Sequence, residues 1–222
     1  MNTLKMQKNN IILAIVPHGD DEVLMCGGTL HKLSKTNQIH VAFVRKPHDK
    51  RTKKQLNATK EAQNILGILK LHYLNISEFD TANEFLTLKT SIEQIVNCVQ
   101  PQIIFTTFYG DNHQDHQNLF RAVSVACRHQ NALSVKHILV GEISSSTDQY
   151  LGPHVFHPTV FINLTEKDIQ AKINAMAAYE TESRKDPHPR SSENMRALAK
   201  VRGAKINAAY AEAFMCIKSI WD

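Results

Sequence analysis

Two short segments of this 222-residue sequence concentrate histidine and carboxylate side chains. Residues 17–22 read Pro-His-Gly-Asp-Asp-Glu, and residues 110–116 read Gly-Asp-Asn-His-Gln-Asp-His. Two histidines and one carboxylate can hold a catalytic zinc ion and leave one coordination position open for water. A second carboxylate can take a proton from that water, and a further imidazole can stabilise the oxyanion of a tetrahedral intermediate. The two segments therefore contain the groups that metal-assisted hydrolysis of an amide or ester requires.

Both segments directly follow a predicted buried strand. Residues 11–17 are a short, continuous apolar run, which is typical of a strand covered on both faces, and residues 102–108 are predicted as a further buried strand. The other predicted strands are 39–44, 71–74, 137–141 and 160–162, and the predicted helices are 23–33, 52–66, 91–99, 118–129, 166–182 and 191–214. This alternation predicts an α/β fold with a mostly parallel sheet and helices on both faces.

The carboxyl ends of parallel strands share one edge of the sheet, and ligands of such folds bind there. This rule brings the two segments to one point. Taken alone, each segment has an ordinary structural explanation. Acidic residues complement the dipole at a helix start, and histidines three residues apart occur on many helix surfaces. Their coincidence at two strand ends favours the functional interpretation.

The composition, with 42% hydrophobic and 21% charged residues, excludes a disordered or fibrous chain. No apolar run reaches the ~20 residues that span a bilayer, and no signal peptide is recognised. We therefore expect a cytoplasmic protein in which residues 1–222 form one domain. The four cysteines lack C-x-x-C spacing, which argues against a zinc ribbon or redox motif. The net charge of +5 suits an anionic ligand without requiring nucleic acid.

These segments and two further motifs resemble the zinc-dependent N-acetylglucosaminyl deacetylase family, also called LmbE-like or PIG-L. Pro17–Glu22 resembles the family's A-H-P-D-D-E signature, and His113–His116 resembles its H-P-D-H signature. Gly27–Thr29 fits its Gly-Gly-Thr, and Tyr210–Phe214 resembles its closing Y-A-E-x-F. The resemblance covers nearly the whole chain and implies a Rossmann-like three-layer α/β fold.

The resemblance implies that His18, Asp21 and His116 are the metal ligands. It implies Zn²⁺ as the cofactor, and Fe²⁺ also fits a set of nitrogen and oxygen ligands. Gly19 and Gln114 stand where the family usually has proline, and neither difference removes a ligand.

The catalytic roles also come from the resemblance. It implies that Asp20 is the general base on the metal-bound water and that His113 is the electrostatic or general-acid histidine. Asp115 would hydrogen-bond the His113 imidazole, fixing its tautomer and favouring its charged form. The implied reaction removes an N-acetyl or similar small acyl group from an amino-sugar derivative, in cell-envelope glycan or nucleotide-sugar metabolism.

Three residues outside these motifs are candidates for substrate binding. Glu142 begins a Ser- and Thr-rich segment, residues 142–147, that follows a predicted strand. Its side chains suit hydrogen bonds to sugar hydroxyls, although such segments are also common turns. His188 and Arg190 precede the last predicted helix, where they could cover the substrate or form a rigid helix entry.

The substrate itself stays open at this stage. Residues 45–54 hold six Lys or Arg and one acid, and this segment could bind the phosphate of a nucleotide-linked sugar or remain a solvated loop. An arginine that many family members carry early in the second helix, for substrate contact, has no clear counterpart here.

Two alternative functions remain. A second enzyme interpretation keeps the metal site but hydrolyses another small amide, such as an N-formyl sugar or a thiol conjugate. A nonenzymatic nucleotide- or nucleic-acid-binding domain is the rival, but the first strand–helix turn lacks a G-x-G-x-x-G or a P-loop lysine. We therefore expect a small N-acylated amino sugar as partner, no nucleic acid, no integral membrane segment, and a chain that could form a homo-oligomer.

Overall fold

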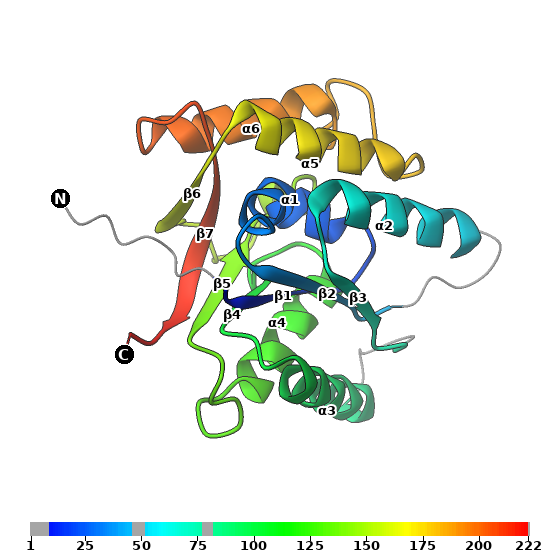
Figure 1. The fold of residues 1–222 in the computed structure, drawn as a ribbon, viewed down its shortest axis with the longest axis vertical. Coiled ribbons are helices and arrows are strands. Elements are labelled where there is room, and N and C mark those ends of the chain that lie inside the picture. The colour runs from blue at the N-terminus through cyan, green and yellow to red at the C-terminus, as the bar shows by residue number, and fades with distance from the viewer. Residues whose placement is uncertain (1–8, 46–51, 77–81, 222) are drawn as a thin grey trace.

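A seven-stranded sheet forms the centre of the computed structural model, which describes residues 9–45, 52–76 and 82–221 (Figure 1). Its strands are β1 (Ile11–Val16), β2 (Gln38–Phe43), β3 (Lys70–Tyr73), β4 (Ile103–Thr107), β5 (His137–Gly141), β6 (Val160–Leu164) and β7 (Tyr210–Ser219). They lie in the order β3-β2-β1-β4-β5-β7-β6. All neighbouring strands are parallel except that β7 runs antiparallel to β5 and β6. The predicted mostly parallel α/β sheet is confirmed.

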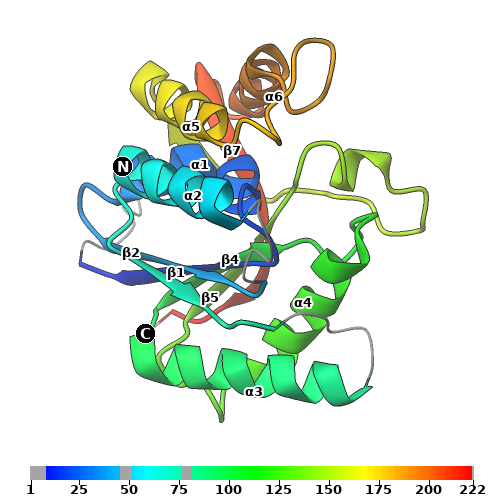
Figure 2. The ribbon, with the colours of Figure 1, turned by 90° about the vertical axis from the view of Figure 1, so that its right-hand side faces the viewer.

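Helices cover both faces of this sheet (Figures 1 and 2). They are α1 (Asp21–Leu33), α2 (Thr52–Leu66), α3 (Ala82–Val99), α4 (Gln114–Ala126), α5 (Glu166–Ala178), α6 (Ser192–Ala204) and the 3₁₀ helix η1 (Thr147–Gln149). Helices α1 and α2 lie on one face, and α3 and α4 lie on the other. Helix α5 packs outside α1 and α2, and α6 contacts β7. None of the described helices is long and apolar enough to cross a membrane.

Strand β1 is buried on both faces, as its continuous apolar sequence predicts. Ile12, Ala14 and Val16 pack into the core beneath α1 and α2. Leu13 and Ile15 pack into the opposite core, against α3 and α4. Because β1 and β4 are parallel neighbours, the segments that follow them emerge side by side at one edge of the sheet.

The end of the chain differs from the prediction. The sequence predicts one helix over residues 191–214, but α6 ends at Ala204 and the closing Tyr210–Phe214 motif lies in β7. Gly203 permits the chain reversal, because a Cβ there would lie 2.6 Å from the carbonyl oxygen of Ala208. The Ala and Glu residues of this motif favour a helix individually, but pairing with β5 and β6 overrides that local preference.

Helix α1 is interrupted near its middle, and a residue of the closing Tyr210–Phe214 motif stabilises the interruption. Cys26 has a non-helical backbone, with φ of −146°. The Glu212 carboxylate of β7 accepts hydrogen bonds from the N–H groups of Gly28 and Thr29, at 3.1 and 2.6 Å. It also pairs with the Lys172 ammonium of α5 at 2.7 Å. Glu212 therefore caps the second half of α1, which links the Gly-Gly-Thr motif to the last strand.

Candidate metal and catalytic site

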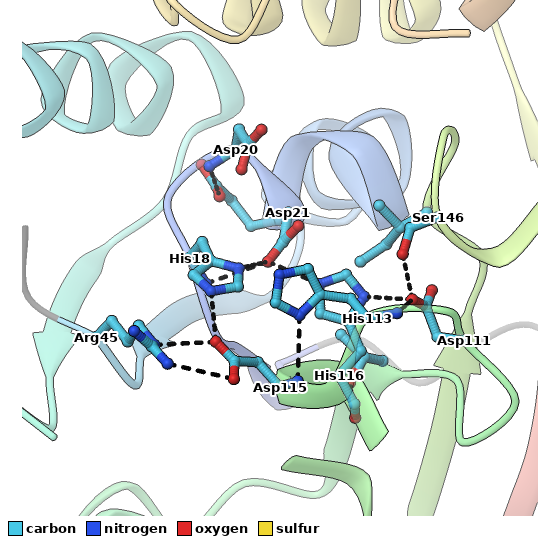
Figure 3. Close-up of polar contacts among 12 residues, drawn as sticks. His18, Asp20, Asp21, Arg45, Asp111, His113, Asp115, His116 and Ser146 are labelled. Atoms are coloured by element: carbon cyan, nitrogen blue, oxygen red, sulfur yellow. Dashed lines mark hydrogen bonds and ion pairs between the residues drawn. The ribbon is translucent and has the colours of Figure 1, made fainter. Parts of the chain in front are cut away.

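The two histidine- and aspartate-rich segments meet at the carboxyl ends of β1 and β4 (Figure 3). His18, Asp21 and His116 each offer a ligand atom, and these three atoms lie within 4.8 Å of one another. Oδ2 of Asp21 lies 3.1 Å from Nδ1 of His18 and 3.4 Å from Nε2 of His116. The structure thus brings together the three residues that the resemblance implies as ligands.

A second carboxylate faces the far nitrogen of each of these imidazoles. Nε2 of His18 lies 2.8 Å from Oδ2 of Asp115, and Nδ1 of His116 lies 2.9 Å from Oδ1 of Asp111. Carboxylates in this position orient metal-binding histidines, fix their tautomer and raise their basicity. Nε2 of His116, the nitrogen on the side away from Asp111, faces Oδ2 of Asp21 at 3.4 Å, so it is placed to act as a ligand atom. The residues present therefore fit a divalent metal ion.

The electrostatics of this cluster also favour a bound cation. Burial lowers the pKa of His116, but the nearby Asp21 and Asp111 carboxylates raise it to about 10. Burial likewise lowers the pKa of His18, and its hydrogen bonds to Asp115 and Asp21 raise it to about 9. Two imidazoles with such high proton affinity indicate an excess of negative charge, which a divalent ion at the same point would neutralise.

A second grouping of possible ligands shares one member with the first. Ligand atoms of His18, His113 and Asp115 also lie within 4.8 Å of one another. However, Nε of Arg45 pairs with the Asp115 carboxylate at 2.9 Å. Since a guanidinium already neutralises this carboxylate, the grouping that contains Asp21 fits a cation better.

The contact expected between Asp115 and His113 is different in the structure. The Asp115 carboxylate pairs with His18 and Arg45, and only its backbone N–H reaches His113, donating to Nδ1 at 3.1 Å. Burial, together with the neighbouring His116 and His18, lowers the pKa of His113. The Asp115 carboxylate therefore does not hold the His113 imidazole in a charged form in this arrangement, and the catalytic role of His113 stays a prediction. Because Nδ1 accepts a hydrogen bond, the neutral ring carries its proton on Nε2.

Asp20, next to the candidate ligand Asp21 in sequence, is only 4% exposed. Its backbone lies in the left-handed region, with φ of 107°, and its N–H donates to the Glu22 carboxylate at 3.0 Å. Non-glycine residues in such conformations persist where the surroundings hold them, often at functional sites. Burial raises the pKa of Asp20, and the neighbouring Asp21 charge raises it further. A raised carboxylate pKa suits a general base that works near neutral pH.

A comparison with protein-family models identifies the family of this chain. Residues 13–127, which include both motifs of the site, match the family described as PIG-L, GlcNAc-PI de-N-acetylase. The chain belongs to the PIG-L family. This confirms the family that the sequence motifs imply.

Individual relatives agree with this assignment to the PIG-L family. A curated Escherichia coli (strain K12) protein named uncharacterized deacetylase YaiS is 27% identical over 182 residues, covering 78% of this chain and 92% of its own. A solved Pyrococcus horikoshii N,N'-diacetylchitobiose deacetylase has a TM-score of 0.71 at 18% identity, covering 94% of this chain and 84% of its own. The family match and the YaiS relative support a deacetylase as the coarse function.

The fold alone does not decide the reaction. A 4-carboxy-2-hydroxymuconate hydratase, GalB of Pseudomonas putida KT2440, has a TM-score of 0.69 at 17% identity, and the match covers 96% of this chain and 98% of the hydratase. Such low identity shows the fold only. The reaction of this PIG-L family member must therefore be argued from its own site.

Arg190, expected to bind substrate, contacts Asp20. Its Nη1 lies 2.9 Å from Oδ2 of Asp20 and 3.1 Å from Oε2 of Glu182, and its Nε donates to Ser145 at 2.8 Å. His188, the second candidate in this segment, accepts a hydrogen bond from the Arg190 N–H at 3.1 Å. The structure therefore places Arg190 beside Asp20, a contact that its position in the sequence does not indicate, and substrate binding by Arg190 and His188 stays a prediction.

Glu142 and the basic segment also have contacts that the sequence does not reveal. Both carboxylate oxygens of Glu142 pair with the Arg202 guanidinium of α6, at 2.7 and 2.6 Å, and substrate binding by Glu142 stays a prediction. In the basic segment, residues 46–51 lie outside the described residues. Arg45 pairs with Asp115, and phosphate binding by this segment stays a prediction.

Sequence reasoning did not single out Asp111 as a site residue. It is fully buried, at 0% exposure, and lies in the turn between β4 and α4. Its position three residues beyond a buried strand at the ligand edge is the one signal that could have revealed it. Its contact with His116 arises only when the chain folds back, and no spacing rule anticipates it.

Proposed function

We propose that this protein is a metal-dependent hydrolase that removes an N-acetyl, or similar small acyl, group from an amino-sugar derivative. The observation that carries this proposal is the convergence of His18, Asp21 and His116 at one point, with the buried carboxylate Asp20 next to Asp21 in the chain. Three ligands from two histidines and a carboxylate are typical of a catalytic site with an open coordination position. Family membership supports amide hydrolysis as the reaction.

The ligands would be the three residues of this convergence, with Asp115 and Asp111 orienting the two imidazoles. Zn²⁺ is the proposed ion, and Fe²⁺ fits the same donors. A bound ion of this kind supplies Lewis-acid polarisation of the amide carbonyl and makes water more acidic.

The remaining chemistry belongs to two side chains. Asp20 takes a proton from the attacking water as the new C–O bond forms. His113, neutral with its proton on Nε2, can donate a hydrogen bond to the developing oxyanion. When the C–N bond breaks, the proton held by Asp20 passes to the leaving amine. The products are a carboxylic acid, which then releases its proton to solvent, and a free amine, and the enzyme is unchanged.

An amino sugar is proposed as substrate from the relatives. The family description names GlcNAc-PI, and the structural neighbour from Pyrococcus horikoshii is named for N,N'-diacetylchitobiose. Both names describe N-acetylated glucosamine units. The contacts of Arg45, Arg190 and Glu142 with other protein groups leave the rest of the substrate to be identified experimentally.

The first test is a measurement of bound metal and released acid. The purified protein is expected to contain close to one divalent ion per chain and to release acetate and free amine from members of a panel of N-acetylated sugars, nucleotide-linked ones included. Parallel N-formyl sugars distinguish acetate release from formate release. Release of no acyl group from any amide of the panel would contradict the proposed function.

A His116→Ala variant tests the ligand assignment. Removing one of three protein ligands is expected to remove most of the bound metal and most of the turnover. His129→Ala is the matched control, because this histidine follows α4 outside the site. Unchanged metal content in the His116 variant would reject the ligand assignment.

A further inference from the structure

We propose that Ser145–Thr147, which joins β5 to η1, is a positioning element that holds the general base and a metal ligand at the same time. The inference rests on the proposed function, because it concerns the same site. Three consecutive residues carry hydroxyl groups, and each hydroxyl contacts a charged side chain of the site. These contacts form two chains of interactions. One reaches Asp20 through Arg190, and the other reaches His116 through Asp111.

The chain of interactions that reaches His116 runs through Asp111. Oγ1 of Thr147 donates to Oδ2 of Asp111 at 2.5 Å, and the Ser146 hydroxyl donates to Oδ1. The backbone N–H of His113 donates to the same Oδ1 at 2.8 Å. These donors hold the carboxylate from both oxygens, so that it faces Nδ1 of His116 (Figure 3). Fixing this second carboxylate fixes the orientation of the imidazole that presents Nε2 to the metal.

The chain of interactions that reaches Asp20 runs through Arg190. Oγ of Ser145 accepts a hydrogen bond from Nε of Arg190 at 2.8 Å. Nη1 of the same guanidinium lies 2.9 Å from Oδ2 of Asp20 and 3.1 Å from Glu182. Because the guanidinium is planar and rigid, a bond at Nε restricts where Nη1 can point. Ser145 and Glu182 therefore position Arg190, and Arg190 positions the carboxylate of the base.

The backbone conformation of Ser145–Thr147 lets neighbouring side chains face Arg190 and Asp111. Ser145 has a left-handed backbone, with φ of 74°, an uncommon conformation for a residue other than glycine. The turn is held by hydrogen bonds from the N–H groups of Ser146 and Thr147 to the carbonyl of Ile143, at 3.1 and 2.9 Å. In return, Oγ1 of Thr147 accepts a hydrogen bond from the Ile143 N–H at 2.9 Å. In this turn Ser145 faces Arg190 while the next residue faces Asp111.

This assignment differs from the sugar-binding role that the sequence suggests for residues 142–147. The three hydroxyls already have partners within the protein. A sugar-binding hydroxyl would affect KM when removed, whereas a positioning hydroxyl would affect metal affinity or kcat. The two interpretations therefore predict different measurements.

The metal side is tested by titrating each apoprotein with Zn²⁺ against a chromophoric chelator. Asp111→Asn is expected to weaken Zn²⁺ binding by about 10–100-fold. Thr147→Val is expected to weaken it in the same direction by a smaller factor, whereas Thr147→Ser, which retains the hydroxyl, is expected to restore wild-type affinity. This readout needs no substrate, so it remains valid if the proposed reaction fails.

The base side is tested by steady-state kinetics at saturating Zn²⁺. Arg190→Ala is expected to lower kcat by about 10²-fold through misplacement of Asp20, with KM and Zn²⁺ affinity unchanged. Arg190→Lys is expected to recover part of this loss, because it returns a positive charge to the carboxylate. Ser145→Ala is expected to lower kcat less than Arg190→Ala does, again without loss of Zn²⁺ affinity. Ser144→Ala, which changes the neighbouring hydroxyl, is the matched control.

Two results would overturn the proposal. One is an increase in KM with unchanged kcat and Zn²⁺ affinity in the Ser145 and Thr147 variants, which would assign their hydroxyls to the substrate. The other is wild-type Zn²⁺ affinity in both Asp111→Asn and Thr147→Val. Circular dichroism and thermal unfolding identify variants that do not fold. If Thr147→Val or Arg190→Ala does not fold, Thr147→Ser or Arg190→Lys is compared with the wild type instead.

Discussion

Asp20→Asn is expected to lower kcat by roughly 10²–10⁴ while leaving the metal content close to that of the wild type. Asn has the shape of Asp and retains an oxygen that can accept from Arg190, so the local structure should persist. It cannot take a proton from water, because its amide is not basic. Burial and the charge of Asp21 raise the pKa of the native carboxylate, which makes it a stronger base than an exposed aspartate. Release of acetate from an N-acetylated sugar gives kcat, and elemental analysis of the same sample gives the metal content.

The control for this variant removes the same charge from a nearby surface position. Asp148 lies exposed in η1, and Asp148→Asn is expected to retain wild-type kcat and metal content. If Asp20→Asn lost its metal, the residue would contribute to binding the ion. If it retained both metal and near-normal turnover, Asp20 would not be the base, and another group would have to accept the proton.

The central strands were predictable because their sequence pattern depends on burial alone. A strand covered on both faces favours apolar residues at successive positions, as in all of β1 and in the first three residues of β4, which ends in two buried threonines. Strand β7 does not follow this pattern. Its first residues, Tyr210–Phe214, contain alanine and glutamate, which favour a helix locally, and their pairing with β5 and β6 joins segments distant in the chain. Helix α3 similarly begins at Ala82 rather than at the predicted Ser91, because its apolar spacing is less regular before that point.

The site was predictable to the extent that it lies in local motifs at strand ends. His18, Asp21 and His116 were found because each belongs to a short segment that directly follows a buried strand. The side chains that contact Asp20 and Asp111 were not found, since they come from other parts of the chain. Arg190 reaches Asp20 across 170 residues, and Ser146 reaches Asp111 across 35. Contacts of this kind are set by the packing of loops, which the local pattern does not encode.

Glu212→Ala is expected to lower the free energy of unfolding by about 3–5 kcal/mol, because it breaks a buried ion pair by removing one partner. The Glu212 carboxylate accepts from the ammonium of Lys172 and from the N–H groups of Gly28 and Thr29. Without it, a buried cation and the two backbone donors lose their acceptor. Urea unfolding, followed by far-ultraviolet circular dichroism, measures the change from the shift in midpoint at constant m-value.

Two further variants separate the causes of this loss. Glu212→Gln combined with Lys172→Met removes both charges and keeps one oxygen for a backbone N–H, so it is expected to recover part of the stability. Glu166→Ala is the matched control, since its ion pair with Arg196 is on the surface and its loss should matter far less. A Glu212→Ala variant as stable as the Glu166 control would show that the broken α1 does not depend on this cap. Because α1 begins at the proposed ligand Asp21, a real dependence would also weaken Zn²⁺ binding.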